Sequence, residues 1–270
     1  MPKRHNPVAD IFKKHPVKRL RRFQPTSASP PEYNEHAMEN GRRYRGHKSE
    51  FPFPNDDEAT RAYSCLNTVW FFLLRDAGHE LISAPVTEGK GKGRNLKVLD
   101  VGARGITWMS ELDDRYPDVR VTVIDPGCAW LYPTDVTVHH ELKGGGKTEG
   151  EGSTSGGWPF TARQAFHYIR GLALWGMISD YEALYAKTYR HLLPGGWVEI
   201  RDNDMQFFTD TPSAEKEEKL ASLRRWEKLI AEAAEKFGKP INVSARHKAW
   251  MEQAGFTEVR EEVFKIPFGA

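Results

Sequence analysis

The sequence predicts an α/β protein: a doubly wound, mostly parallel sheet with an N-terminal helical cap and a disordered basic tail. The run Val98-Leu-Asp-Val101 is short and apolar, as is typical of a strand buried on both faces. It breaks at Gly102 and Gly105, before an amphipathic segment from Trp108 to Tyr116. Farther on, strand-like and helix-like segments alternate almost to the end of the chain. This alternation is what specifies a parallel sheet with helices on its faces.

Composition sets outer bounds on the fold. With 270 residues, 39% of them hydrophobic and 28% charged, the chain can form one large α/β domain with an appendage. No run approaches the roughly 18 apolar residues of a membrane-spanning helix, and the N-terminus lacks a secretory pattern. We therefore expect a soluble intracellular protein. Cys65 and Cys128 are far apart and without metal-ligand spacing, so we expect free thiols that are buried or half-buried.

Residues 1–32 form the predicted disordered tail, because they are rich in proline and basic side chains. Residues 1–22 hold eight Lys and Arg side chains against one Asp, a charge of +7 on a chain whose net charge is +2. The basic cluster at residues 13–22 suggests a nuclear-import or nucleic-acid patch, and the alternative is a solvated tail with no receptor. We expect a cytoplasmic or nuclear location. Sequence-specific DNA binding is not expected, because no recognition helix or zinc spacing accompanies the cluster.

Residues 33–88 form the predicted helical cap. The segment from Tyr33 to Tyr44 can be helical, and Asn55-Asp-Asp-Glu58 supplies the capped, acidic start of a second helix. Apolar side chains then recur every three or four residues up to Ala77, and Gly78 ends the helix. We expect its aromatic side chains in the core rather than against a ligand.

A second buried strand is predicted over Val119–Asp125, and Asp125 ends it with an acidic side chain where a ribose diol is commonly held. The third strand, Val136–Val138, leads into His139-His-Glu141. Adjacent side chains of a strand point to opposite faces, so these histidines are not expected to share a metal ion. Residues 144–157 should be a mobile glycine-rich loop. Their Gly-Lys-Thr is not a phosphate-binding loop, because the glycine-spaced turn before it is missing.

The remaining elements continue the alternation. In order they are strand Ala165–Ile169, helix Tyr181–Leu193 capped by Asp180, a Pro194-Gly-Gly196 turn, strand Trp197–Ile200, helices Ala214–Phe237 and Ala249–Gln253, and a sixth strand Phe256–Ile266.

Several motifs together resemble the fungal LaeA-like class I methyltransferases, over residues 33–269. They are Glu39-Asn-Gly-Arg-Arg-Tyr44, Phe51-Pro-Phe-Pro-Asn-Asp56, Val98-Leu-Asp-Val-Gly102, Asp125, Phe166-His-Tyr-Ile169, Leu193-Pro-Gly-Gly-Trp-Val-Glu199, Trp250-Met-Glu-Gln-Ala-Gly-Phe256 and Lys265-Ile-Pro-Phe-Gly269. The resemblance implies that residues 89–270 form a Rossmann-like methyltransferase domain with S-adenosylmethionine as cofactor. It also implies a possible link to the regulation of secondary metabolism or development.

The resemblance implies a cofactor site at the carboxyl ends of the first strands. Asp100 and Gly102 would face the methionine end, Asp125 the ribose hydroxyls and Glu141 the adenine amine. Two aromatic side chains, Tyr44 and Trp108, would line the pocket. Methyl transfer from a sulfonium requires no general base, so His47 and Asp202 are only weak candidates for that role and are better explained as structural residues.

The chain departs from the family in its glycine turn and at its C-terminus. The family pattern is Asp/Glu-x-Gly-x-Gly-x-Gly, whereas Arg104 and Ile106 stand at the second and third glycine positions and Gly105 is displaced by one. The guanidinium of Arg104 would either bind the cofactor carboxylate or close the cavity. The seventh strand of the family is missing, so the sheet would either expose an unpaired edge that is open to a protein partner, or its sixth strand would shift next to the fifth.

Two hypotheses follow. The chain is an active methyltransferase acting on a small molecule or a protein side chain, or it is a methyltransferase-like subunit with weak or no catalysis that binds a protein and regulates it. Asp100, Gly102 and Asp125 favour the first hypothesis, whereas Arg104 and Ile106 favour the second. An NAD-dependent dehydrogenase is a third and poorer hypothesis, because it would need the glycine fingerprint even more strictly and does not require the Pro-Gly-Gly turn before the fifth strand.

Overall fold

The fold was analysed in a computed structural model of the chain. The structure describes residues 36–45, 52–79, 81–87, 95–102, 107–116, 118–124, 137–139, 166–209 and 213–266. The predicted tail, the Gly/Lys linker before Lys97 apart from Asn95, and the glycine-rich loop at 144–157 lie outside these residues. No helix in the described part of the chain is both long and apolar enough to cross a membrane.

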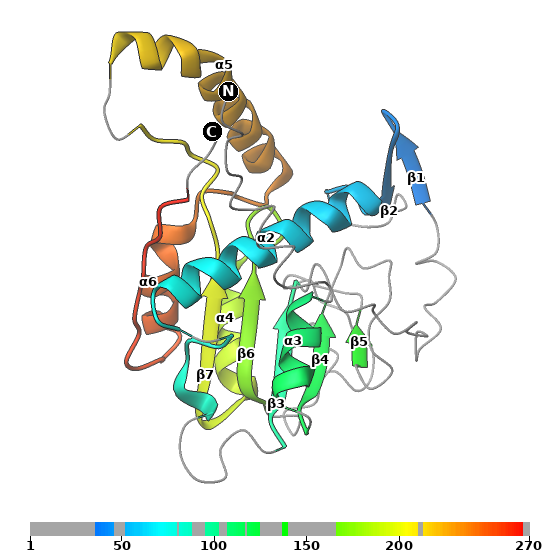
Figure 1. Cartoon of the computed structure of the whole chain (residues 1–270), viewed down its shortest axis with the longest axis vertical. Helices are drawn as coiled ribbons and strands as arrows, with labels where there is room; N and C mark the ends of the chain where they lie inside the picture. The colour runs from blue at the N-terminus through cyan, green and yellow to red at the C-terminus, as the bar shows by residue number, and fades with distance from the viewer. Residues whose placement is uncertain are drawn as a thin grey trace, which may run out of the picture.

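In the described residues, a parallel sheet of five strands forms the centre of the molecule, which confirms the predicted parallel arrangement (Figure 1). Its order is β5 (Thr137–His139), β4 (Arg120–Ile124), β3 (Lys97–Val101), β6 (Phe166–Leu172) and β7 (Leu192–Arg201). The chain runs from β3 outward to β5 and then returns to the other side of β3 with β6. The carboxyl ends of β3 and β6 therefore flank a topological switch point, which is where open α/β sheets bind ligands.

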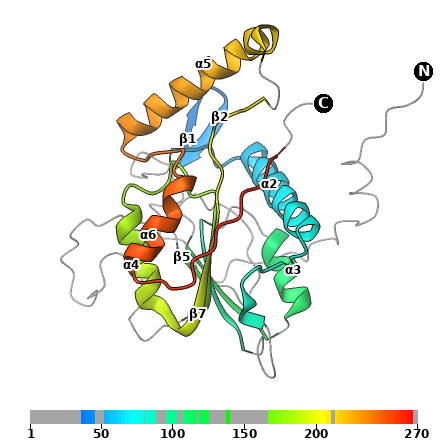
Figure 2. The ribbon, with the colours of Figure 1, turned by 90° about the vertical axis from the view of Figure 1, so that its left-hand side faces the viewer.

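Helices cover both faces of the sheet. On one face, α3 (Thr107–Arg115) places Trp108, Met109 and Leu112 in a buried cluster with Val98 and Tyr168 of the strands. Helix α2 (Asp57–Asp76) lies beside α3 on this side (Figure 2). The opposite face packs against α4 (Tyr181–His191) and α6 (His247–Gln253). Alternating side chains of each strand thus serve two separate cores.

The two predicted N-caps are confirmed. Asp56 accepts a hydrogen bond from the N–H of Ala59 at 2.9 Å, and Asp180 accepts one from the N–H of Ala183 at 2.8 Å. Each carboxylate satisfies a backbone donor that has no partner within its helix. Gly78, with φ of +83°, ends α2 as expected.

The long helix α5 (Ala214–Phe237) has the predicted boundaries and lies beyond the carboxyl ends of β6 and β7 (Figures 1 and 2). Its inner side contributes Ile230, Ala231 and Ala234 to a third apolar cluster, which includes Trp70 of α2. Trp70 is buried, as predicted for the aromatic side chains of that helix. Two single-turn 3-10 helices, η2 (Pro85–Thr87) and η3 (Ser244–Arg246), complete the helical elements of the described chain.

The prediction of a helix over Tyr33–Tyr44 is wrong. Residues 36–45 form an antiparallel hairpin of β1 (His36–Glu39) and β2 (Arg42–Arg45). Its two turn residues, Asn40 and Gly41, have φ of +50° and +74°, the combination that a tight two-residue hairpin turn requires. The cap therefore consists of a hairpin and a helix.

The prediction of a sixth strand over Phe256–Ile266 is also wrong. This segment is irregular and pairs with no strand. It runs from α6 past β7 to α2 (Figure 2), where the ring of Phe264 meets Trp70 edge-on at 6.0 Å and Glu262 lies 2.9 Å from His79. Side-chain contacts with the cap replace strand pairing. Within the described residues, β7 is therefore an edge of the sheet.

Two smaller corrections concern α4 and Cys65. Helix α4 ends at His191 and β7 begins at Leu192, so the predicted Pro-Gly-Gly turn is a bulge inside a strand. Pairing with β6 jumps from Phe166 opposite Leu192 to Tyr168 opposite Trp197. Cys65 is a free thiol but lies exposed on α2, and Cys128 is outside the described residues.

Candidate cofactor site

The turn after β3 is built for glycine. Gly102 has φ of +72°, and its N–H donates to the carbonyl of Ile124 at 2.7 Å, which ties the carboxyl ends of β3 and β4 together. A Cβ at this position would lie 2.9 Å from Cδ2 of Leu174. Both the dihedral and the close contact disfavour any other residue. The first glycine of the predicted motif therefore has a clear structural role at the carboxyl edge of the sheet.

Asp100 forms a buried ion pair with an arginine of the neighbouring strand. In the parallel pairing of β3 and β6 it lies opposite Arg170, whose Nη1 donates to both carboxylate oxygens at 3.1 Å. Asp100 is 0% and Arg170 2% exposed. The carboxylate thus meets a guanidinium of the protein in this structure, and its expected role at the methionine end of a cofactor stays a prediction.

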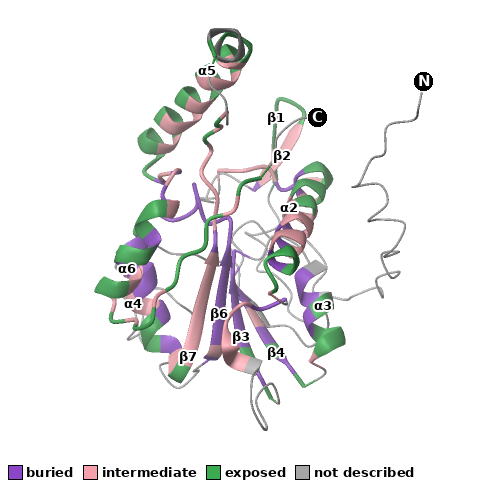
Figure 3. Cartoon of the chain, turned by 60° about the vertical axis from the view of Figure 1, so that its left-hand side comes forward, coloured by how far each residue is buried: buried purple, intermediate pink, exposed green. Residues whose placement is uncertain are grey.

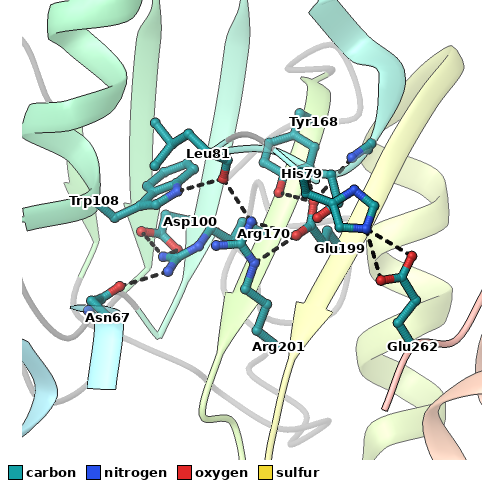
Figure 4. A network of polar contacts seen from close by, with 12 residues as sticks. Asn67, His79, Leu81, Asp100, Trp108, Tyr168, Arg170, Glu199, Arg201 and Glu262 are labelled. Atoms are coloured by element: carbon teal, nitrogen blue, oxygen red, sulfur yellow. Dashed lines mark hydrogen bonds and ion pairs between the residues drawn. The ribbon is translucent and has the colours of Figure 1, made fainter. Parts of the chain in front are cut away.

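The guanidinium of Arg170 also contacts helices α2 and α3 (Figure 4). Nη2 of Arg170 donates to Oδ1 of Asn67 in α2 at 2.9 Å, and the guanidinium carbon lies 4.3 Å from the ring centroid of Trp108 in α3. Nε of Arg170 is buried without a hydrogen-bond partner among the described residues. Trp108, expected to line the cofactor pocket, is therefore packed against Arg170.

Burial dominates the electrostatics of this ion pair. It raises the pKa of Asp100, an effect that the charge of Arg170 opposes. It lowers the pKa of Arg170, an effect that Asp100 opposes. Each charge is tolerated in the interior because the other is present, and removal of one leaves an uncompensated charge out of water.

A second polar network adjoins the first on the next strand. Glu199 of β7 accepts hydrogen bonds from the hydroxyl of Tyr168 at 2.8 Å, from Nε of Arg201 at 2.7 Å and from the N–H of Ser83 at 3.0 Å. Arg201 also donates through Nη2 to the carbonyl of Leu81 at 2.8 Å. The segment that follows α2 is thereby held onto β7.

Burial alone would raise the pKa of Glu199, but Arg201, the Tyr168 hydroxyl and the Ser83 N–H together lower it below its ordinary value of 4.5. Its carboxylate is therefore ionised at neutral pH and acts as an anchor for β6, β7 and the segment after α2.

The other predicted site residues fall into two groups. Tyr44 lies half-buried in β2 of the hairpin. The remaining ones lie outside the described residues, so their roles stay predictions: Arg104, Gly105, Ile106, Asp125, Glu141 and His47. Within the described part of the chain, no group of three His, Cys, Asp or Glu side chains could hold a metal ion.

Asp202, a weak candidate base, takes part in a chain of buried hydrogen bonds. Its Oδ2 lies 3.1 Å from Nε2 of His247, and Nδ1 of that histidine lies 2.8 Å from the hydroxyl of Tyr185. All three side chains are almost fully buried. The chain of hydrogen bonds joins the end of β7 to α6 and α4, which supports the structural explanation.

Sequence analysis missed Arg170 and Asn67. A signal for Arg170 was present, because it directly follows a predicted buried strand, Ala165–Ile169, and a buried arginine needs a counter-charge. Asp100 is the acidic side chain of the adjacent strand. Asn67 carried no comparable signal, because an asparagine within a helix has no defined partner until the helix is docked.

Comparison of the sequence with known proteins identifies the family of this chain. Residues 72–261 match the sequence model of the family described as "Methyltransferase domain". The chain is 27% identical over 237 residues to the methyltransferase pytC of Aspergillus terreus, covering 85% of this chain and 65% of that protein. It therefore spans about two thirds of that relative's length.

Two further relatives confirm the predicted resemblance. One is the secondary metabolism regulator LAE1 of Cochliobolus heterostrophus, 25% identical over 241 residues, covering 88% of this chain and 73% of the relative. The other is the protein-methionine methyltransferase laeA of Emericella nidulans, 25% identical over 257 residues, covering 91% and 60%. Since the family match alone spans more than half of the chain, this protein belongs to the methyltransferase-domain family and is LaeA-like, with S-adenosylmethionine as the family's cofactor.

Proposed function

We propose that the chain is a catalytically competent methyltransferase that binds S-adenosylmethionine at the carboxyl ends of β3 and β4. The observation that carries this proposal is the Gly102 turn. It stands at the topological switch point, between a buried strand and α3, in a conformation that only glycine adopts easily.

The described half of the site fits this cofactor. The methionine end of S-adenosylmethionine carries both a carboxylate and an ammonium group, so it requires an environment without a large excess of either charge. The Asp100–Arg170 pair supplies such an environment beside Gly102, because each side chain neutralises the other. In the proposed complex Asp125 would hold the ribose hydroxyls and Glu141 the adenine amine, while Arg104 would bind the carboxylate.

Chemistry at this site depends on position rather than on a base. The sulfonium of S-adenosylmethionine supplies an activated methyl group, and its leaving group is a neutral thioether. The residues of the chain would therefore act by orienting the acceptor in line with the methyl group and by excluding water. The buried arrangement of Asp202 with His247 agrees with this, since neither side chain is available to take a proton from an acceptor.

We further propose a regulatory role in secondary metabolism or development, with a protein side chain or a small molecule as the methyl acceptor. Relatives named as a secondary metabolism regulator and as a protein-methionine methyltransferase support the regulatory role and a protein acceptor, respectively. A nuclear site of action is supported by the basic cluster at residues 13–22. Deletion of residues 1–22 should then move a fluorescently tagged chain from nucleus to cytoplasm.

A second candidate function is a methyltransferase-like regulator with weak catalysis that binds a protein. The observation that favours it is the edge position of β7, which no segment of the described chain covers by strand pairing. An extended segment of another protein could add to this edge by backbone hydrogen bonds. Arg104 and Ile106 in place of two glycines favour the same function.

Calorimetry with S-adenosylmethionine distinguishes the two. We expect saturable binding by the full chain and a clear loss of affinity in Asp125→Ala. If the folded chain shows no binding but Arg104→Gly creates it, the arginine fills the cavity and the second function holds. Arg260→Gly is the matched control, because Arg260 is exposed in the C-terminal segment and away from the turn.

A further inference from the structure

Helix α5 presents an apolar stripe to solvent. Trp226, Leu229 and Phe237 are 42%, 54% and 53% exposed, and Ala233 between them is exposed as well. The inner side of the same helix packs on the body of the protein (Figure 3). Large apolar side chains seldom gather on the outer side of a surface helix, which is normally polar. Within the described part of the chain, the stripe is therefore a candidate contact surface.

The spacing within the stripe is that of a helix-pairing seam. Trp226, Leu229 and Ala233 follow one another at intervals of three and four residues, which correspond to the a and d positions of a heptad. At 100° per residue they lie within a narrow sector of the helix, and Phe237 continues it by one turn. A seam of this kind packs against one other helix.

The loop residue Phe207 packs against Trp226 and is hydrogen-bonded to α5. The ring of Phe207 lies 6.3 Å from that of Trp226, and the N–H of Phe207 donates to Oε1 of Glu227 at 2.6 Å. Arg224 donates to the carbonyl of Phe207 as well. Phe208, the next residue, is 82% exposed. The apolar surface is thus held in place on α5 and needs little ordering before it binds.

Two charges on one flank of the stripe indicate which helix pairs with it. Arg225 and Glu232 are seven residues apart and therefore lie on the same flank, one helical repeat from each other. When two copies of α5 pair in antiparallel fashion about a two-fold axis near Leu229, this flank meets the same flank of the second copy in the reverse direction. Arg225 of each copy then faces Glu232 of the other.

A parallel arrangement lacks this complementarity. It would bring the charged flank of one copy against the other flank of the second copy, which carries Leu223 and Ile230. Ile230 is already packed against the body of its own chain. Among the described residues of one copy, Glu232 has an exposed contact with Lys228 at 3.9 Å, a kind of pair that contributes little.

We propose that α5 is a self-association surface. Two copies of the chain pair through antiparallel α5 helices, with Trp226, Leu229 and Ala233 in the seam and Arg225–Glu232 ion pairs on either side of the axis. The large Trp226 of one copy lies next to the small Ala233 of the other in this register, so the two surfaces can interdigitate. The proposal is independent of whether the chain binds S-adenosylmethionine.

Sedimentation equilibrium of the full chain tests the dimer. At concentrations on the order of 100 µM we expect dimers, and Leu229→Glu should weaken association by about 100-fold because it places two carboxylates at the axis. Glu235→Arg is the control, since Glu235 lies on the opposite side of α5, and its dimer should persist. A monomeric wild-type chain, or a dimer that Leu229→Glu leaves intact, would overturn the proposal.

Charge exchange tests the antiparallel register. Arg225→Glu and Glu232→Arg should each weaken the dimer by about tenfold, because symmetry doubles every repulsive contact. The double variant Arg225→Glu/Glu232→Arg should restore association to near the wild-type level. Circular dichroism should not change in any of the three, and neither should the unfolding midpoint measured at a concentration low enough for the chain to be monomeric. Failure of the double variant to recover would show that the two side chains do not meet across the axis and would overturn this arrangement.

Discussion

The two faces of the central sheet bury different chemistry. On the face toward α2 and α3, neighbouring strands place Asp100, Arg170 and Glu199 directly side by side, so that negative, positive and negative charges form a row across β3, β6 and β7. On the face toward α4 and α6, the corresponding positions are apolar, as with Leu99 and Ile169. Within each strand, alternate residues point to opposite faces, so one strand supplies both kinds of position.

This difference separates two tasks. The apolar face stabilises the domain through transfer of side chains out of water, which depends on area and little on direction. The charged row adds little net stability of its own, and the apolar cluster around Val98 and Trp108 stabilises that face. The hydrogen bonds of the row are directional and set how the sheet, α2 and α3 meet beside the Gly102 turn. The geometry of the candidate site is thus defined by polar contacts that contribute little to net stability.

The largest expected effect comes from breaking the charged row at its centre. Arg170→Met should destabilise the protein by about 3–5 kcal/mol, because it leaves the buried carboxylate of Asp100 without a partner. Chemical denaturation measures the change, with Arg190→Met on the exposed side of α4 as the control. The double variant Asp100→Leu/Arg170→Met should recover most of the loss. If it does not, the pair contributes net stability and the comparison of the faces is wrong.

On the apolar face, Leu99→Ala should cost about 2–4 kcal/mol of unfolding free energy through lost transfer and the cavity that remains. Chemical denaturation again measures the change. Unlike the Asp100–Arg170 pair, Leu99 has no partner on a neighbouring strand whose substitution should restore the lost stability. A change below about 1 kcal/mol would show that this face can collapse around the missing side chain.

At the margin of the apolar face, His247→Ala should lower the unfolding free energy by about 1–3 kcal/mol. The substitution removes the histidine partner of the buried Tyr185 hydroxyl and leaves the buried carboxylate of Asp202 with backbone N–H donors such as that of Asn203 at 3.1 Å. Lys248→Ala, on the neighbouring exposed residue, is the control and should be close to neutral. Methyl-transfer activity, once detected, should fall no more than stability does; a specific loss of activity would give Asp202 and His247 a catalytic role.

The smallest expected effect is the loss of stability that protonation of Glu199 causes at acidic pH. The folded protein lowers the pKa of Glu199, so this residue stabilises the fold above its unfolded value of 4.5, and the contribution is lost as pH falls through the folded pKa. The difference in unfolding free energy between the wild type and Glu199→Gln should therefore become smaller as the pH falls from about 5 to about 3. Unfolding midpoints measured across that range provide the readout. Parallel curves would mean that the carboxylate does not titrate differently in the two states.

Much of the architecture could be predicted from local patterns. The caps at Asp56 and Asp180, the boundaries of α5 and the strands β3 and β4 are all signalled within a few residues of where they occur. The Asn40-Gly41 turn was equally local, and the hairpin was missed because helical spacing was preferred over turn chemistry. The error over Phe256–Ile266 is of another kind, because β-like composition forms a strand only where an edge accepts it.

The site shows the same division. Glycine at position 102 and an acidic residue at position 100 follow from the motif, but the partner of that acid does not, since it comes from a strand seventy residues away in the chain. Nor does the motif show that Trp108 lies over Arg170, because that requires α3 to be docked on the sheet.

The order of β3 to β7, the helix starts at Asp56 and Asp180, the limits of α5 and the need for glycine after β3 were therefore contained in the chain's local chemistry, because dihedral preferences, capping and hydrophobic period act over a few residues. Pairing of Asp100 with Arg170, the position of the C-terminal segment along α2 and the outward direction of the α5 stripe were decided by folding alone. They depend on which surfaces meet in three dimensions, and contact between residues distant in sequence is not specified by either residue separately.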